Sequence, residues 1–428
     1  MKKVVLIAGT RTPFLRSGTD YMDLMAYQLG QYAISGLLKK TGIAPKSIDR
    51  VIMGTVMSHS KTSNLARESA LTAGIPFTTP CHTVTQACIS ANQAITSGVE
   101  QIMAGQADIV IAGGSDCTSD APIMFNKPMR KKLFNAQKLK TPLEFLKFAT
   151  TIRLKDFNPE RPAVAEFTTG RTMGLDCDIM AQKFGVQRKE QDDFALRSHH
   201  LAAKAESEGI LANEITAVEV GPKFKSVSKD NGIRGDAKAE KLAQLKPAFV
   251  KPPLGTLTAA NSSFLSDGAS AVLIMSEDKA KELGLKPLAY IHSYSYVGCD
   301  VNSELLLGTA YATAAVLKRA KLDLKDMDVV EFHEAFAGQI IANIKCLESE
   351  EFSKKNFGYD KAVGKINMDT FNIHGGSLAI GHPFGATGGR LITTVANRLV
   401  RENGRYGLLS ACAAGGHGHA MIIERYIN

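Results

Sequence analysis

The sequence predicts an α/β protein built from two similar units, each with a buried sheet covered by helices. Short apolar runs such as residues 4–9 and 107–113 alternate with stretches of helical period, which is the pattern of buried strands separated by helices. A similar order of elements returns after residue 284. In each unit a reactive residue precedes a helix and a glycine-ended strand follows it, which indicates a duplicated unit.

The first unit reads as a strand at 4–9, a helix near 21–40, a strand at 50–56, a helix after Cys88 and a strand at 107–116. In the stretch HTVTQACISANQAI, residues 82–95, the β-branched residues before Cys88 favour an extended backbone, and the apolar residues after it recur at helical spacing. We therefore expect Cys88 near the first turn of a helix. There the helix dipole and free N–H groups would lower the thiol pKa and supply donors for an oxyanion, as suits a nucleophile. A buried, inert thiol is the alternative.

The second unit is expected to hold a strand at 287–298, a helix at 309–320, a strand from 328 that ends in polar residues, a glycine-rich loop leading into a helix at 374–400, and two closing strands at 406–427. Residues 121–252 interrupt the plan and are interpreted as an insertion over the site, with a helix around 188–208.

Composition sets limits on function. The 428 residues are 44% apolar and 22% charged, which is typical of a globular protein. Seven cysteines, scattered singly, favour a reducing compartment, and we expect a cytoplasmic location. The first apolar run, VVLIA, is too short for a secretion signal or a membrane span. The net charge of +9 attracts anionic partners, but no nucleic-acid-binding motif accompanies it, so we expect no nucleic acid.

The segment from Lys127 to Lys155, within a basic stretch at 124–158, has the pattern of a basic amphipathic helix divided by Pro128 and Pro142. Three interpretations stay open for it. It packs on its own subunit, which we favour, or docks a partner subunit, or touches an anionic membrane at the periphery.

Four glycine-rich segments carry reactive groups. They contain Cys88, His333 with Glu334 in EFHEAFAG, His382 in GGSLAIGHPFGATGG, and Cys412 in SACAAGGHGH. Two thiols and a histidine suggest chemistry on thioesters, in which one thiol holds an acyl group and the other moves a proton. His417 and His419 are too few ligands for a metal, and we expect none.

Together these segments resemble the thiolase family. The resemblance covers nearly the whole chain, through GTRTPF, TQACISANQAI, AGGSD, TAANSSFLSDGA, HEAFA, GGSLAIGHPFGATGGR and CAAGGHG. Ile-Ser after the nucleophile, HEAFA instead of NEAFA, and CAAGG instead of CxGGG are most similar to the β-subunit branch of the fatty-acid β-oxidation complexes.

The resemblance implies a duplicated fold with α-β-α-β-α layers. We expect an N-terminal domain over 1–278, with a lid at about 121–252, and a C-terminal domain over 284–428. It further implies a homodimer, and a hetero-oligomer with a hydratase/dehydrogenase α-subunit as a further option. Coenzyme A would be a substrate, and no cofactor is implied.

The implied reaction is the cleavage of a 3-ketoacyl-CoA by CoA. Cys88 would become acylated, His382 would take its proton, and Cys412 would exchange a proton with the enolate of acetyl-CoA. The backbone N–H groups of Cys88 and Ala414 would form one oxyanion hole, in which Ala414 replaces the usual glycine and so keeps the donor but adds a Cβ to the turn.

His333 would serve the second oxyanion hole, where many members have Asn. Glu334 is either an orienting group or a salt-bridge partner. Ser263 and Met173 would line the CoA channel, and basic residues of the insertion would meet the CoA phosphates. The alternatives are a biosynthetic acetoacetyl-CoA thiolase, a decarboxylating ketoacyl synthase, against which Cys412 argues, and a non-catalytic acyl-CoA or lipid carrier.

Overall fold

The first half of the chain builds a five-stranded sheet. The computed structural model describes residues 2–160, 162, 165–252 and 254–427, so Met1 and Asn428, the outer ends of the two expected domains, lie outside it. The strands lie in the order β4-β3-β5-β10-β1, with β3 parallel to β4 and β5, and β10 antiparallel to its neighbours. They span Cys81–Val84 (β4), Arg50–Gly54 (β3), Ile109–Asp116 (β5), Ser266–Ser276 (β10) and Val4–Arg11 (β1), and the short β2, Leu15–Arg16, pairs with β10.

The second half repeats this order. Its strands run β12-β13-β14-β11, in which the parallel pair β12-β13 is followed by antiparallel pairs, as the parallel pair β3-β5 is in the first half. A parallel bridge between Val330 and Phe371 lies beside β12, where β4 lies beside β3 in the first half. The two halves are joined where β1 and β11 pair in antiparallel fashion through two pairs of residues. The predicted duplication is therefore confirmed; the strands span Val329–Phe332 (β12), Tyr406–Ala413 (β13), His417–Arg425 (β14) and Ala289–Gly298 (β11).

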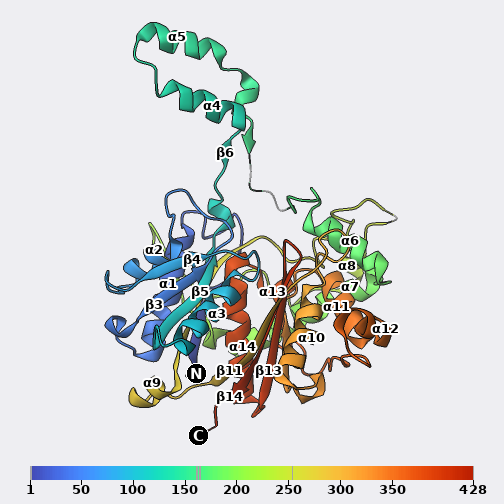
Figure 1. Ribbon diagram of the computed structural model, residues 1–428. Helices are drawn as coiled ribbons and strands as arrows, with labels where there is room; N and C mark the ends of the chain where they lie inside the picture. The colour runs from blue at the N-terminus through green and yellow to red at the C-terminus, as the bar shows by residue number, and fades with distance from the viewer. Residues whose placement is uncertain (1, 161, 163–164, 253, 428) are drawn as a thin grey trace.

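Helices form three layers around the two half-sheets (Figure 1). One pair covers the outside of the first half, α1 (Ala26–Thr41) and α2 (Leu65–Thr72), and another covers the outside of the second, α10 (Gly308–Ala320) and α11 (Ala337–Glu348). Between the halves lie α3 (Ser90–Met103) and α14 (Thr387–Arg401). Twelve of the fifteen residues of α14 are buried, as a helix enclosed on both sides requires. The expected α-β-α-β-α layers are present.

The segment between β5 and β10 forms two different parts. One part packs on the second half through α6 (Met173–Lys183) and α7 (Arg188–Ser207), which contact α11, and α8 (Ala239–Ala243) packs on α7. The hairpin of β8 (Val218–Val220) and β9 (Lys225–Val227) instead packs on the first half, where its valines share a hydrophobic cluster with α1. The remaining short helices of the fold are α9 (Glu277–Glu282), α12 (Glu350–Phe352) and α13 (Ser377–Ile380).

The other part, residues 123–158, is a helical hairpin that projects from the body and is here called the arm (Figure 1). Its elements are β6 (Met124–Phe125), α4 (Lys127–Ala136) and α5 (Pro142–Thr151), and β6 pairs with β7 (Pro159–Glu160) at the base. Both predicted proline breaks are confirmed, since Pro128 and Pro142 each lie in the first turn of a helix, behind the caps Asn126 and Thr141.

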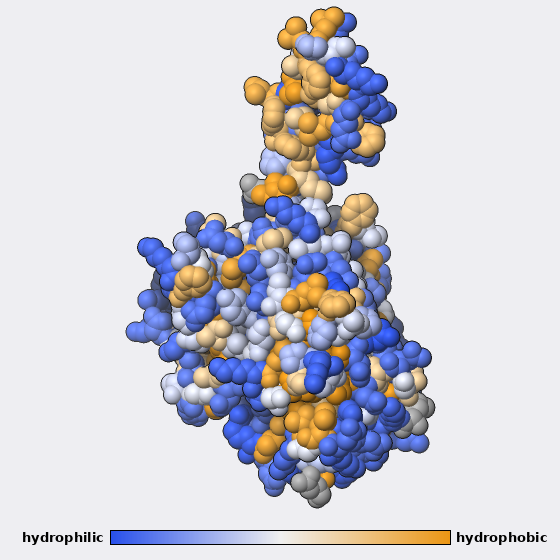
Figure 2. Space-filling model, turned by 90° about the vertical axis from the view of Figure 1, so that its left-hand side faces the viewer, coloured by the Kyte–Doolittle hydropathy of each residue, from blue (hydrophilic) through white to orange (hydrophobic). Residues whose placement is uncertain are grey.

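The favoured expectation that this segment packs on its own subunit is wrong for the single chain. Its apolar side chains point into solvent, with Leu143 60% and Leu146 65% exposed, and orange apolar and blue polar faces lie side by side on the arm in Figure 2. The arm also does not cover the site. Among the described residues, no helix combines the length and the apolar character needed to cross a bilayer.

Candidate active site

Cys88 lies in a tight turn between β4 and α3. The helix begins at Ser90, two residues after Cys88, so Cys88 lies near the first turn of the helix, as expected, and just before its cap at Ile89. Ala87 has a left-handed backbone with φ of 47°, which is unfavourable for a residue with a Cβ. The Ser90 hydroxyl holds this turn by accepting from the Gln86 N–H at 2.8 Å and donating to the Ala87 carbonyl at 2.7 Å.

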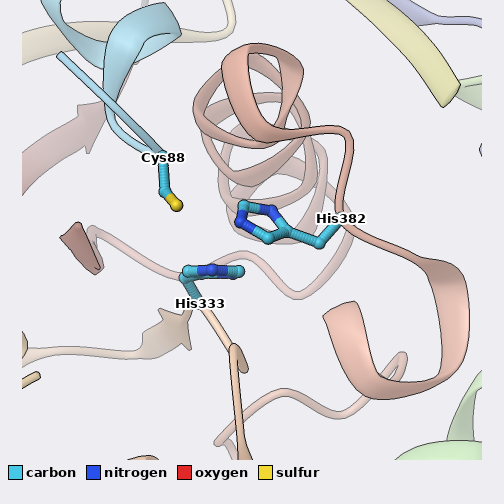
Figure 3. A group of neighbouring side chains, drawn as sticks. All are labelled: Cys88, His333 and His382. Carbon is cyan, nitrogen blue, oxygen red and sulfur yellow. The ribbon is translucent and has the colours of Figure 1, made fainter. Parts of the chain in front are cut away.

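Two imidazoles face the Cys88 thiol (Figure 3). His333 follows β12 directly and His382 lies in the loop between α13 and α14. The sulfur of Cys88 and one ring nitrogen of each histidine all lie within 4.8 Å of one another. The sequence-predicted thiol and histidines therefore meet at one point between the two halves.

Burial determines the protonation state of this trio. It raises the pKa of the Cys88 thiol to about 12, although the N–H groups of Ala414 and Cys88 itself bond the sulfur and act in the opposite direction. The expected depression of the thiol pKa by the helix dipole is thus wrong, because desolvation outweighs it. Burial also lowers the pKa of His382 to about 3 and that of His333 well below its ordinary value. The resting site is a neutral thiol beside two neutral imidazoles.

The hydrogen bond between Thr387 and His382 determines which ring nitrogen of His382 carries the proton. The Thr387 hydroxyl lies 2.6 Å from His382 Nδ1 and donates its own proton to the Pro383 carbonyl at 3.1 Å. It can therefore only accept from Nδ1–H, which leaves a lone pair on Nε2. This Nε2 is buried and has no hydrogen-bond partner in the described part of the chain. His382 can consequently accept the Cys88 proton.

Asp116 holds two loops, the one that carries His382 and the one that follows β3. It ends β5 and accepts the N–H of Gly385 at 2.6 Å, beyond His382, and that of Met57 at 2.8 Å, in the loop after β3. The hydroxyl of Thr55 adds a third bond at 3.0 Å. One buried carboxylate therefore links the histidine loop to the wall of the outer pocket.

Cys412 reaches the same pocket from the end of β13, and its side chain is buried. Burial raises its pKa above the ordinary range, and the charge that would form on Cys88 raises it further, so both thiols rest protonated. The adjoining turn has positive φ only at Gly415 (82°) and Gly416 (69°), not at Ala414. A side chain at position 414 therefore fits the turn, and the Glu166 carboxylate accepts the Gly415 N–H at 2.7 Å.

An inner and an outer cavity meet at Cys88. The inner one measures about 80 Å³ and the outer about 370 Å³, and Cys88, Met173, Phe384 and Ala414 line both. The inner cavity is lined further by Ser263, His382, Cys412 and the apolar side chains of Phe264, Leu306 and Phe336. The structure thus places the two predicted channel residues, Ser263 and Met173, beside the reactive groups. This apolar lining suits an acyl chain.

Glu334, His417 and His419, which the sequence also singled out, lie outside the group of reactive side chains around Cys88. Glu334 is buried and accepts from Ser198, from Asn372 and from the Leu378 N–H, so it orients the loop after His333. His417 is exposed, whereas His419 is buried against Tyr296 and bonds Asn92 at 3.0 Å. These two histidines do not share an environment. Among the residues that the structure describes, the atoms close enough to share a metal ion are instead those of Cys88, His333 and His382.

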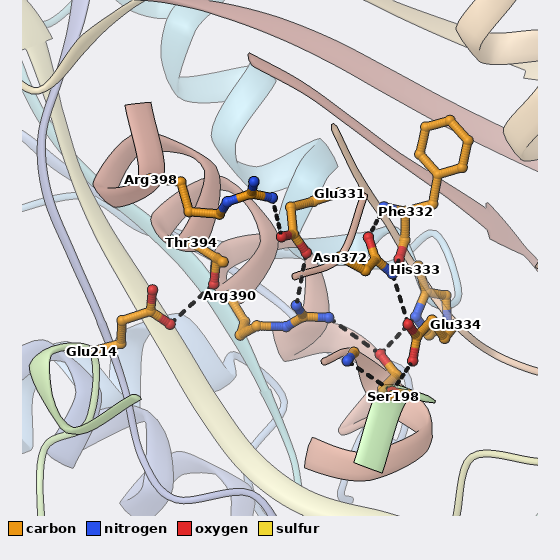
Figure 4. A network of polar contacts seen from close by, with 12 residues as sticks. Ser198, Glu214, Glu331, Phe332, His333, Glu334, Asn372, Arg390, Thr394 and Arg398 are labelled. Carbon is orange, nitrogen blue, oxygen red and sulfur yellow. Dashed lines mark hydrogen bonds and ion pairs between the residues drawn. The ribbon is translucent and has the colours of Figure 1, made fainter. Parts of the chain in front are cut away.

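Sequence reasoning missed the groups behind the imidazoles. Ser377 Oγ lies 2.9 Å from His333 Nδ1 and also accepts from Arg390 Nη2 at 3.3 Å (Figure 4). Ser377, Thr387 and Arg390 all lie within the motif GGSLAIGHPFGATGGR, so their proximity in sequence was a signal for them. Asp116 ends the motif AGGSD, which was noted only for the resemblance and not as a site, and nothing in the sequence pointed to Glu166.

Comparisons with known proteins agree with this architecture. The thiolase N-terminal domain matches residues 4–278 and the thiolase C-terminal domain matches residues 285–425. The mitochondrial trifunctional enzyme subunit beta of Rattus norvegicus is 53% identical over 426 residues, covering 100% of this chain and 89% of the relative. A probable 3-ketoacyl-CoA thiolase of Caenorhabditis elegans is 49% identical, covering 100% and 95%.

Among solved structures, an acetyl-CoA acetyltransferase of Bacillus anthracis superposes with a TM-score of 0.85 at 32% identity, covering 100% of this chain and 99% of that one. The two domain matches together, and each of the two relatives by itself, extend over nearly all of the present sequence. The chain therefore belongs to the thiolase family, a family of acyltransferases.

Proposed function

We propose that the protein is a 3-ketoacyl-CoA thiolase of fatty-acid β-oxidation, which cleaves a 3-ketoacyl-CoA with CoA to give acetyl-CoA and a shortened acyl-CoA. The observation that carries this proposal is the meeting of two protonated thiols and a basic imidazole in one apolar pocket. The relatives named above as subunit beta and 3-ketoacyl-CoA thiolase, at 53% and 49% identity, support it.

In the first half-reaction the Cys88 sulfur attacks the 3-keto carbon while its proton passes to His382 Nε2. The bond between C2 and C3 then breaks, and C2 departs as the enolate of acetyl-CoA. Cys412 protonates that carbon, which releases acetyl-CoA and leaves an acyl thioester on Cys88. Because burial raises the pKa of the Cys88 thiol to about 12, its deprotonation is coupled to the attack.

In the second half-reaction the Cys412 sulfur, now a thiolate, takes the proton of an incoming CoA thiol. The CoA sulfur attacks the acyl carbon, and the bond to Cys88 breaks. The Cys88 sulfur recovers the proton from His382, so both thiols and the imidazole return to their starting states.

Each oxygen that becomes negative needs donors. The N–H groups of Cys88 and Ala414, which already converge on the Cys88 sulfur, would hold the oxygen of the tetrahedral intermediates. The second oxyanion, the thioester oxygen of the enolate, would be served from the side of His333.

The direct test is turnover of CoA and 3-ketoacyl-CoA substrates of four to sixteen carbons, with Cys88→Ala as the control. We expect cleavage of medium and long chains and a mass increase on Cys88 equal to the shortened acyl group. Activity confined to the four-carbon substrate would support the acetoacetyl-CoA alternative. Turnover of a malonyl thioester with release of carbon dioxide would support a synthase, and no acyl-enzyme at all would support a carrier.

For assembly, the subunit-beta relatives support a hetero-oligomer with an α-subunit, built on a homodimer of this chain. Co-expression with a hydratase/dehydrogenase chain, followed by sedimentation, tests both associations.

The arm is proposed to bind an anionic membrane surface. Residues 123–158 contain nine Lys and Arg against two acidic residues, so they hold +7 of the net charge of +9. Ten large apolar side chains of the arm are exposed: Ile123, Met124, Phe125, Leu133, Phe134, Leu143, Phe145, Leu146, Leu154 and Phe157. Exposed apolar area beside clustered cations is the composition of interfacial helices.

Sedimentation with vesicles tests this binding, using one preparation of neutral lipid and another that contains about 30% anionic lipid. A chain without the arm and a Leu143→Ser/Leu146→Ser chain serve as comparisons. Binding to anionic vesicles only, lost in both variants, is expected. Loss of α-subunit association without loss of vesicle binding would assign the arm to the partner instead.

A cytoplasmic location is likewise proposed, supported by seven free cysteines. Because the subunit-beta relative is mitochondrial by name, cell fractionation that places this chain in an organelle would contradict it.

A further inference from the structure

We infer that Ser377 is a positioning residue that holds His333 as the Nε2–H tautomer, so that His333 donates a hydrogen bond to the enolate oxygen. This inference rests on the proposed function for the identity of the oxyanion. The protonation pattern itself rests on the hydrogen bonds of the chain.

The argument begins at Arg390, on α14. Its side chain is 1% exposed and lies 3.9 Å from a carboxylate oxygen of the fully buried Glu331, which also accepts from Arg398 at 2.9 Å (Figure 4). A guanidinium carries donors only. Its contact to Ser377 Oγ at 3.3 Å therefore uses an oxygen lone pair and leaves the hydroxyl proton free.

That proton has one hydrogen-bond acceptor among the described residues, His333 Nδ1 at 2.9 Å. If Ser377 donates to Nδ1, the ring proton must lie on Nε2. His333 Nε2 is buried and has no hydrogen-bond partner among the residues that the structure describes, and one ring nitrogen of His333 lies within 4.8 Å of the Cys88 sulfur. A buried donor without a partner is unfavourable at rest and becomes satisfied when an anionic oxygen arrives.

His382 has the opposite arrangement. Its Nδ1 faces a hydroxyl that already donates elsewhere, so its Nε2 is a base, whereas the Nδ1 of His333 faces a hydroxyl that can donate only to it. Thr387 and Ser377 thus give two adjacent rings complementary roles. One ring accepts the thiol proton and the other stabilises developing negative charge.

Arg390 strengthens the division of roles because its positive charge disfavours protonation of both rings. It contributes to lowering the pKa of His333 and that of His382. An imidazolium would lose the distinction between the two nitrogens. With both rings neutral, each hydroxyl partner decides where the single proton lies.

The protonation pattern is tested by nitrogen-15 NMR of the full-length protein labelled at histidine, with signals assigned by their loss in His333→Asn and His382→Asn. We expect the protonated nitrogen to be Nε2 in His333 and Nδ1 in His382. Ser377→Ala should turn the His333 signal into a mixture of tautomers. A wild-type His333 protonated on Nδ1 overturns the inference, whatever the activity.

Ser198→Ala is the matched control, because Ser198 also has a buried hydroxyl, which donates to Glu334 at 2.7 Å rather than to an imidazole. It should leave the His333 tautomer unchanged. If both serine variants disturb the His333 signal equally, Ser377 supports structure only, and the inference fails.

Kinetics give a second, independent test. Ser377→Ala should lower kcat about ten- to a hundredfold, less than the hundred- to thousandfold typical of deleting an oxyanion donor, with KM nearly unchanged. In a His333→Asn background the same substitution should have no further effect on kcat. A full additional loss in that background contradicts action through His333. Absence of any thiolysis by the wild type would refute the proposed function, while the NMR result would still decide the tautomer.

Discussion

The rings of His333 and His382 lie 4.0 Å apart between their centroids and are inclined by 43°. One ring follows a strand of the C-terminal sheet and the other precedes a central helix, so the pair exists only in the folded chain. Their proximity is possible because both are neutral, and protonation of either would create a charge against the other ring.

The Cys88 thiol should react as an isolated, high-pKa thiol. Because burial raises its pKa to about 12 and lowers that of His382 to about 3, no thiolate-imidazolium pair forms near neutrality. The rate of alkylation by iodoacetamide, followed by mass spectrometry of the Cys88 peptide, should therefore rise about tenfold per pH unit from pH 7 to pH 9. A rate that stays constant across this interval would show an ion pair and contradict the prediction.

Cys412→Ala should separate the two chemical roles of the thiols. Loss of the proton donor should lower kcat for thiolysis about a hundred- to ten-thousandfold. Alkylation of Cys88 should continue at the wild-type rate, since Cys412 does not take the Cys88 proton. Cys346→Ala, which removes a buried thiol of α11, is the control for packing. Equal kinetic losses in both variants would argue against a proton-transfer role.

The turn after β13 should tolerate glycine at 414 but not a side chain at 415. Ala414 lies outside the left-handed region, whereas Gly415 has φ of 82°. Ala414→Gly should retain activity within a few-fold, because the N–H donor remains. Gly415→Ala should lower the free energy of unfolding by about 1–2 kcal/mol. Denaturant unfolding and kcat measured on both proteins would reveal any reversal of this order.

Acid should destabilise the protein partly through His199. Burial lowers its pKa to about 4, and its Nδ1 accepts the Arg234 N–H, so only the unfolded chain binds a proton there between pH 6.5 and 4. Its contribution to stability is present above pH 6.5 and is lost as the pH falls, amounting to about 3 kcal/mol across that interval. His199→Asn keeps an acceptor but removes the proton site.

The test is urea unfolding of both proteins at half-unit steps of pH. The variant should show a shallower loss of the free energy of unfolding below pH 6.5 than the wild type. Parallel curves for the two proteins would mean that His199 does not titrate on unfolding.

Much of the fold could be predicted from the sequence, because the spacing of apolar residues and the positions of glycines indicate the strands and helices of this chain. The repeat of β3-β5-β10-β1 as β12-β13-β14-β11 was visible as a recurring order of segments, even though the two halves share few identical residues. The meeting of Cys88, His333, His382 and Cys412 followed from the family resemblance, not from spacing.

Other properties were not accessible from sequence. The sign of the Cys88 pKa shift depends on how much solvent the fold removes, and a helix-start pattern does not reveal that. The direction of the arm depends on the path of the chain through its base, so an amphipathic pattern was compatible with packing, partner or membrane. The role of Ser377 depends on the hydrogen bond that it accepts from Arg390, and the two residues lie on different helices, α13 and α14.

The duplicated architecture has one further consequence. Cys88 enters the site at the start of α3 and His382 shortly before α14, and these two central helices belong to opposite halves of the chain and touch each other. The thiol and its base are therefore supplied by opposite halves of the chain, and the contact between these halves passes through the catalytic centre. A small shift of one half relative to the other would slow proton transfer before either half unfolded. The enzyme should therefore lose turnover under mild perturbation well before it loses its folded structure.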